Sequence, residues 1–233
     1  MELLSKSELD IKLLRFSWII PLFTLILSMS IHWLSGDART ALIYISEADY
    51  PGMQRIVFTS GLAITGLIYS FLSYKIYLNF KDSTPRRLLL IISTIGGIYI
   101  GVNLIAMSFL DMYDHFSGHI LTALSVFYGG MLWGLAIHFS LPKTSTNIKC
   151  LRLGSVLFSV FGFITMTVSY NKAAQELGKA VILYEEMSLV QHPYLDIAAI
   201  GEYALVVGFF MILLSIELDV KKSLILEDIR DNN

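Results

Sequence analysis

The sequence has a single cysteine, Cys150, among its 233 residues. No disulfide can therefore form within the chain, and a zinc site built from cysteines is excluded. Charged residues are scarce as well, at 15% of the chain, where globular domains carry about 25%. With a net charge of −2, the chain has no positive field that would attract nucleic acid. These absences argue against nucleic acid as a partner and point towards a membrane protein.

Sequence signatures of catalysis are missing too. There is no Gly-x-Ser-x-Gly nucleophile motif, no phosphate-binding glycine loop, no dinucleotide fingerprint and no His-Glu-x-x-His zinc motif. The inverted half-repeat found in many transporters is not visible either. We therefore expect no cofactor and no metal. An intramembrane hydrolase stays open as an alternative, because its catalytic residues need not be close in sequence.

Long apolar runs fill much of the chain. Six of them hold about 20 or more mainly apolar residues, enough to cross about 30 Å of hydrocarbon at about 1.5 Å per residue. We predict an all-α fold, a single integral-membrane domain over residues 1–233 built as a bundle of six transmembrane helices. The predicted spans are 14–35, 56–79, 88–110, 116–141, 151–170 and 195–217, with larger outer loops at 36–55 and 171–194. The second loop is either a short amphipathic helix or lid, or an ordinary loop.

Lysine and arginine are distributed unequally between the two sides of this predicted bundle. The side that holds both termini has thirteen of the seventeen, and the other side has only Arg39, Arg55, Lys172 and Lys179. Positive charge is retained on the cytoplasmic side of membranes. We therefore predict that both termini are cytoplasmic, which an even number of spans also requires.

Glycine pairs at four-residue spacing occur within two predicted spans. Gly97 and Gly101 lie in span 88–110, and Gly130 and Gly134 lie in span 116–141. Small residues at this spacing let membrane helices approach closely. We expect these pairs to pack helices together inside one bundle, and a homodimer seam is the weaker alternative.

Two polar residues lie deep within predicted spans, near their outer ends. Asn103 is about 10 Å from the outer end of its span at about 1.5 Å per residue, and Glu202 is at a similar depth. A carboxyl group in hydrocarbon costs a few kcal/mol unless it faces the bundle. We predict that Glu202 faces inward, towards the third or fourth span. It is either a neutral, hydrogen-bonded structural residue or part of an ion, proton or lipid-headgroup site.

The histidines gather on the same outer side. In "HFSGHILTALSVFY", residues 115–128, His115 and His119 are four residues apart, a spacing that places two residues on one helix face. They are metal ligands, acid/base groups, a pH sensor or simply polar residues at the membrane surface. We predict a polar pocket lined by His115, Glu202 and Asn103, with His119, His192 and Asp196 as accessory residues.

Several stretches of the sequence resemble segments of one known family. They are "YISEADYPGMQRIVF", "GVNLIAMSF", "HFSGHILTALSVFY", "FITMTVS" and "AAIGEYALVVGFF", in this order. Together they resemble the damage-regulated autophagy modulator (DRAM) family, within the wider Frag/DRAM/Sfk group of six-span membrane proteins. The resemblance covers about residues 15–220. One departure is Tyr203, which stands where the family usually has tryptophan.

The resemblance implies a multi-pass protein of the lysosome, Golgi, other endomembranes or plasma membrane, with a role in autophagy or lipid handling. It also implies that His115, Ser46, Glu47 and Glu202 form the shared site, because the family motif includes the first histidine and not His119. We expect membrane lipids as partners, and protein partners stay open.

Three functions fit these observations. The first is a non-enzymatic protein that binds or organises lipid, whose outer polar pocket holds a headgroup. The second is a lipid-remodelling enzyme, either a hydrolase or an acyl-transfer enzyme. The third and weakest is an ion- or proton-coupled transporter, because one buried acid gives it little support.

Overall fold

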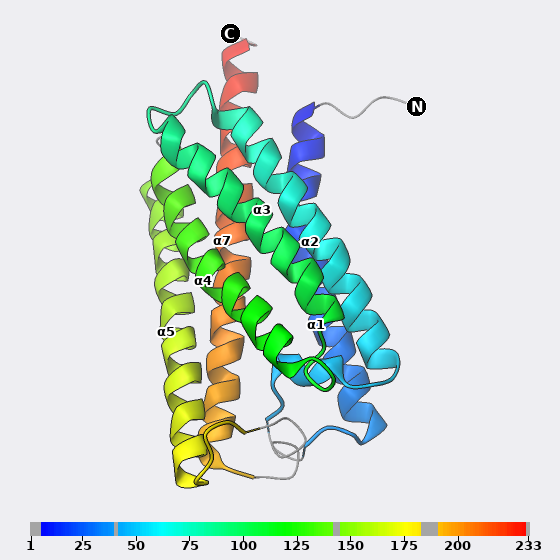
Figure 1. Ribbon diagram of the computed structural model, residues 1–233. Coiled ribbons are helices and arrows are strands. Elements are labelled where there is room, and N and C mark those ends of the chain that lie inside the picture. The colour runs from blue at the N-terminus through cyan, green and yellow to red at the C-terminus, as the bar shows by residue number, and fades with distance from the viewer. Residues whose placement is uncertain (1–5, 40–41, 142–144, 183–190, 232–233) are drawn as a thin grey trace.

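The computed structural model describes residues 6–39, 42–141, 145–182 and 191–231. Within these ranges the chain is helical and has no strand. The first described residue, Lys6, and the last, Asp231, lie at the same end of the bundle (Figure 1). The elements are α1 (Lys6–Ser35), the short 3₁₀ helix η1 (Ile45–Asp49), α2 (Met53–Phe80), α3 (Arg87–Phe109), α4 (Phe116–Ser140), α5 (Thr146–Glu176) and α7 (Pro193–Asp231).

The prediction of six membrane-crossing helices is confirmed by length and composition. Six described helices are long and apolar enough to span a bilayer, at 23 to 31 residues each. Three of the helices extend well beyond the predicted spans: α1 begins at Lys6, α5 continues to Glu176 and α7 continues to Asp231. Hydropathy marks only the part of a helix that lies in hydrocarbon, whereas backbone hydrogen bonding continues into water. The loop prediction for 171–194 falls partly on residues 183–190, which lie outside the described residues.

Glycines bring neighbouring helices into close backbone contact inside the bundle, as expected. A Cβ atom added at Gly101 of α3 would lie 2.5 Å from the carbonyl oxygen of Gly66 in α2. In α4, Gly130 and Gly134 receive the side chains of Phe209 and Ile212 from α7. These glycine pairs therefore serve packing within one chain.

Buried ion pairs join the helices near the end that carries the termini. Arg152 of α5 is fully buried, donates to the hydroxyl of Ser215 at 2.9 Å and pairs with Asp219 of α7. Asp10 of α1 pairs with Lys75 of α2 at 2.9 Å. Each of these pairs fixes the position of one helix relative to another, because separating its two side chains would leave a buried charge without a partner.

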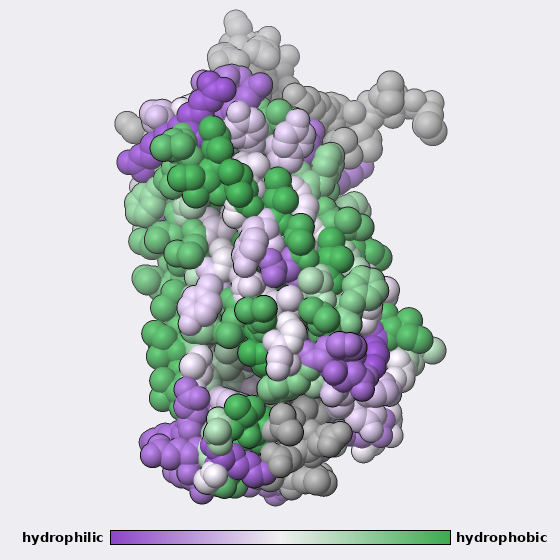
Figure 2. All heavy atoms as spheres, viewed as in Figure 1, coloured by the Kyte–Doolittle hydropathy of each residue, from purple (hydrophilic) through white to green (hydrophobic). Residues whose placement is uncertain are grey.

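The surface shows the polarity expected of a membrane protein. A broad apolar band covers the middle of the molecule, and polar residues gather at both ends (Figure 2). Large apolar side chains are exposed on this band, among them Phe23 at 67%, Leu67 at 63% and Leu121 at 68%. An exposed apolar surface of this extent marks contact with a partner or a membrane. With six apolar helices, the chain has the build of an integral multi-pass membrane protein.

Candidate functional site

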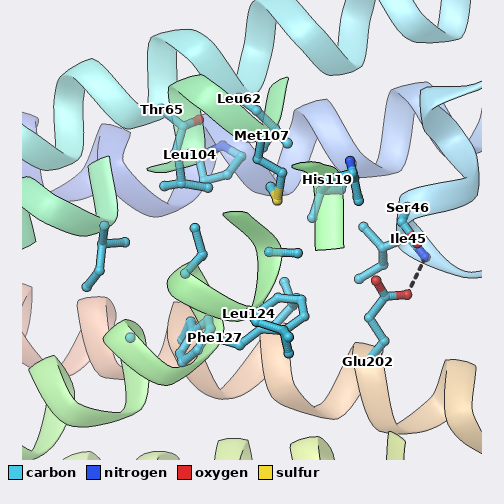
Figure 3. A pocket seen from close by; sticks show the side chains of 18 of the residues that line it. Ile45, Ser46, Leu62, Thr65, Leu104, Met107, His119, Leu124, Phe127 and Glu202 are labelled. Atoms are coloured by element: carbon cyan, nitrogen blue, oxygen red, sulfur yellow. Dashed lines mark hydrogen bonds between the residues drawn. The ribbon is translucent and has the colours of Figure 1, made fainter. Parts of the chain in front are cut away.

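A cavity of about 310 Å³ lies inside the bundle. Five of the membrane helices and η1 contribute large apolar side chains to its wall, and α5 adds Met166, Thr167 and Tyr170. Glu202, Ser46 and His119 lie together at one end, while Leu62, Leu104 and Phe127 lie further along (Figure 3). Thr65 also lies further along, and its hydroxyl donates to the carbonyl oxygen of Gly61 in its own helix. A long apolar cavity with a few polar groups at one end is typical of a ligand site.

Helices α4 and α5 both contribute to the wall of the cavity. These two helices diverge towards the end opposite the termini, and both line the cavity there (Figure 1). Ile120 of α4 lines the cavity and is also 38% exposed. At Ile120, a single side chain therefore separates the cavity from the outside.

Glu202 of α7 is the anchor of the polar end. Its side chain is 5% exposed, and its carboxylate accepts a hydrogen bond from the backbone N–H of Ile45 at 2.7 Å. The backbone N–H and the hydroxyl of Ser46 donate to the same carboxylate. The prediction that Glu202 faces inward is confirmed, but the hydrogen-bond partners that the structure records come from η1 and not from the third or fourth span. Hydrogen bonds to three donors satisfy a carboxylate that would otherwise be costly to bury.

The outer loop folds over the cavity because buried charges hold it there. Glu47 is fully buried, accepts the backbone N–H of Tyr44 at 2.9 Å and forms an ion pair with Arg39 at 2.9 Å. Arg39 also lies 3.6 Å from Asp196 at the start of α7. Glu47 and Asp196 thus shape the loop and do not line the cavity. Sequence reasoning missed Arg39, whose signal was an arginine among the acidic residues of the loop 36–55.

The two histidines have the reverse of their expected positions. His119 is 2% exposed and lines the cavity, whereas the side chain of His115 is 55% exposed and lies 3.4 Å from Asp111 outside it. His115 is the N-cap of α4, with φ −130° and ψ 38°. Its carbonyl oxygen accepts the backbone N–H of His119 at 2.9 Å, but its non-helical φ gives its side chain a different environment from that of His119. The expected placement of His115 in the pocket and of His119 as an accessory is therefore corrected.

Two more predicted residues lie away from the cavity. Asn103 donates to the carbonyl oxygen of Tyr99 within α3, so its amide is satisfied by its own helix. His192 pairs with Glu176 at 3.2 Å, at the outer ends of α5 and α7. Of the predicted site, the structure brings Glu202, Ser46 and His119 together around the cavity.

Tyr44 is a cavity residue that sequence reasoning did not single out. Its side chain is 6% exposed and lines the cavity, and its hydroxyl has no hydrogen-bond partner among the described residues. Burial raises the pKa of this hydroxyl, and the negative charge of Glu202 raises it further. The hydroxyl therefore stays protonated and can both donate and accept a hydrogen bond.

A second group of charges surrounds Arg55, beside the cavity end. Its guanidinium lies 3.9 Å from Asp49, 3.3 Å from Asp111 and 3.6 Å from Asp114. Burial raises the pKa of Asp49 to about 7, although Arg55 opposes this shift. Burial alone would also raise the pKa of Asp111, but hydrogen bonds from the backbone N–H groups of Asp114 and Tyr113 lower it. One arginine thus contacts three carboxylates, and the pKa values of two of them, Asp49 and Asp111, are shifted in opposite directions.

Metal binding was one of the alternatives for the outer histidines. In the part of the chain that the structure describes, no three His, Cys, Asp or Glu side chains gather closely enough to hold a metal ion. The histidines are instead distributed between the cavity, the Asp111 contact and the outer end of α7.

No family model, curated protein or solved structure matches this chain. The resemblance to the DRAM family therefore stays a prediction from the five quoted stretches. The fold and site define a class and no more: a six-helix, multi-pass membrane protein with an apolar cavity inside its bundle.

Proposed function

We propose that the protein binds a membrane lipid in the central cavity, with the apolar part of the lipid along the bundle and its polar group beside Glu202, Ser46 and His119. The single observation that carries this proposal is the cavity itself. It is about 310 Å³ in volume, apolar along most of its length and polar at one end. That distribution of apolar and polar side chains matches an amphipathic molecule. Ligand pockets commonly have volumes of about 300–1,000 Å³.

The proposed entry route lies within the membrane. The cavity is lined by both α4 and α5 where they diverge, and Ile120 there is exposed. A lipid would enter sideways between these helices, without passing through water. The Lys and Arg distribution supports an orientation with both termini in the cytoplasm, so the polar end of the cavity would face the outer leaflet.

Binding without catalysis is the better supported function. The polar groups at the cavity end include Glu202, but hydrogen bonds from η1 already occupy its carboxylate. A general base needs a carboxylate that can reach the substrate. A lipid-remodelling enzyme is the second candidate, because His119 lines the same cavity end. A role in autophagy or lysosomal membranes stays a prediction from the resemblance alone.

Photolabelling with a variant that fills the cavity tests the proposal. Full-length protein in bilayer nanodiscs would be labelled by a photoactivatable phospholipid, and labelled peptides identified by mass spectrometry. We expect label on α4 and α5 beside the cavity. Ala123 is 8% exposed and lines the cavity, so Ala123→Trp fills it and should remove this label.

Leu121→Trp is the matched control, because Leu121 lies on the same helix but is 68% exposed. This variant should keep the label. Equal labelling of both variants would contradict lipid binding in the cavity. Appearance of a cleaved or transferred lipid product during the incubation would instead favour the enzyme.

A further inference from the structure

Two polar atoms at the cavity end are left without partners by the folded chain. One is the hydroxyl of Tyr44, which is enclosed and unpaired among the described residues. The other belongs to His119, whose Nδ1 lies 2.8 Å from the carbonyl oxygen of Leu110. A carbonyl oxygen only accepts, so Nδ1 carries the hydrogen and Nε2 of the neutral ring is an acceptor. No described residue donates to that Nε2.

Unpaired polar groups in a buried wall are costly, so they indicate what a ligand supplies. Nearly all buried polar groups in folded proteins are hydrogen-bonded. The cavity end offers one acceptor, at His119, and one group that can donate, at Tyr44. A ligand hydroxyl satisfies both, because it donates one hydrogen bond and accepts another. An ester carbonyl or an ether oxygen could satisfy only Tyr44.

The charges around the cavity argue against an anionic headgroup. Among the described residues that line it, there is no lysine or arginine, and the only carboxylate is that of Glu202. The guanidinium of Arg39 lies over the Tyr44 ring, 5.1 Å from its centroid, and is paired with Glu47. A phosphate at this end would meet a carboxylate without a free cation, which is unfavourable at low dielectric.

We propose that the cavity selects an uncharged lipid with a free hydroxyl group, which donates to Nε2 of His119 and accepts from the hydroxyl of Tyr44. The inference rests on the proposed lipid binding and adds the chemical class of the ligand. Sterols, diacylglycerols, ceramides and long-chain alcohols share this chemistry. The hydroxyl lies at the polar end, and the hydrocarbon follows the apolar length of the cavity between α4 and α5.

A series of matched single-chain competitors tests the class. Full-length protein in detergent micelles is labelled by a photoactivatable alkyl probe, in competition with hexadecanol, its methyl ether or hexadecyl phosphate. All three share one chain and differ only in the head. We expect the alcohol to compete roughly tenfold better than the ether and the phosphate, the effect of one hydrogen bond.

Tyr44→Phe tests the hydrogen bond that the tyrosine hydroxyl donates. The variant keeps the ring but removes the donor from which the alcohol and the ether both accept, so both should compete several-fold less well than in the wild type, while the alcohol keeps its advantage over the ether through His119. Tyr128→Phe is the control, because Tyr128 is 52% exposed and lies outside the cavity. The wild-type series alone decides the question if Tyr44→Phe fails to fold by size-exclusion chromatography.

The outcomes separate the two proposals. Equal competition by alcohol and ether, or stronger competition by the phosphate, overturns the hydroxyl inference and leaves lipid binding intact. If the probe labels no cavity residue, or if none of the three competitors displaces it, lipid binding in the cavity fails and the inference fails with it.

Discussion

Asp49 gives the stability of the protein a dependence on pH. Its side chain is fully buried, and burial raises its pKa from 3.8 to about 7. Between these values the folded state holds a proton that the unfolded state releases. Stability from this group is therefore present at low pH and is lost as pH rises towards about 7. We expect the wild type to lose up to roughly 2 kcal/mol from this source between about pH 5 and pH 7.

Asp49→Asn checks this expectation, because the amide does not titrate. The difference in thermal stability between wild type and variant should change across that pH window and be constant above it. The lowered pKa of Asp111 acts only at much lower pH, so it does not interfere. Asp82→Asn is the control, since Asp82 is exposed in the turn between α2 and α3. A constant difference from about pH 5 to pH 8 would contradict the prediction.

Glu202 holds the outer loop against α7, so its charge matters for stability. Glu202→Gln keeps the shape but turns one acceptor oxygen into a donor that faces the N–H groups of η1. We expect a loss of about 1–3 kcal/mol in unfolding free energy. Trypsin should also cleave faster after Arg39, which is buried in the wild type. Glu176→Gln, at an exposed carboxyl, should behave as wild type, and equal resistance of both variants to trypsin would argue against this anchor.

Sequence reasoning succeeded for single residues where the membrane itself imposes a rule. Glu202 faces inward because a carboxyl in hydrocarbon has no favourable alternative. The prediction failed for His115 and His119, because His115 is the N-cap of α4 and its φ of −130° is not helical, so its side chain does not follow the helix face of His119. Nothing in the sequence singles out Tyr44, because a hydroxyl is seen to lack a hydrogen-bond partner only once η1 has folded against α7.

Close packing of α2 against α3 depends on Gly101. A methyl group there would meet the carbonyl oxygen of Gly66 and the backbone nitrogen of Ser70, neither of which can move without shifting a helix. We expect Gly101→Ala to destabilise the protein by about 1–3 kcal/mol, as overpacking usually does. Gly154→Ala in α5 is the matched control, because an added Cβ meets nothing within 4 Å.

Gly154→Ala should be neutral or stabilising by up to about 1 kcal/mol, since alanine favours helix more than glycine does. Unfolding of both variants by denaturing detergent measures the difference. Equal midpoints would show that the α2–α3 contact tolerates a wider separation than the structure has.

Whole elements were easier to predict than their arrangement. All six membrane helices follow from the length of their apolar runs, and the glycine pairs indicated close contacts between helices. The pairing of helices was not predictable, because it depends on contacts between distant residues such as Arg152 and Asp219. The apolar length of the cavity was not predicted for the same reason: its wall combines side chains from six helices and η1 that lie far apart in the sequence.

The orientation of the whole molecule in the membrane can be tested with its own cysteine. Cys150 is exposed near the start of α5, at the end of the bundle that carries both termini. With thirteen of the seventeen lysines and arginines on that side, we predict that it is cytoplasmic. In intact cells, a maleimide that cannot cross membranes should label Cys150 only after lysis.

The same reagent can then report on the opposite side. Asp37 is exposed in the outer loop, so the double variant Cys150→Ser with Asp37→Cys should be labelled in intact cells when the protein is at the plasma membrane. If the protein is instead in an organelle, opening the plasma membrane alone should allow the maleimide to label Cys150. Labelling of Asp37→Cys should then also require that the organelle membrane is permeabilised. The reverse pattern at both positions would place the termini and the charged end outside, and the cavity would then open to the cytoplasmic leaflet.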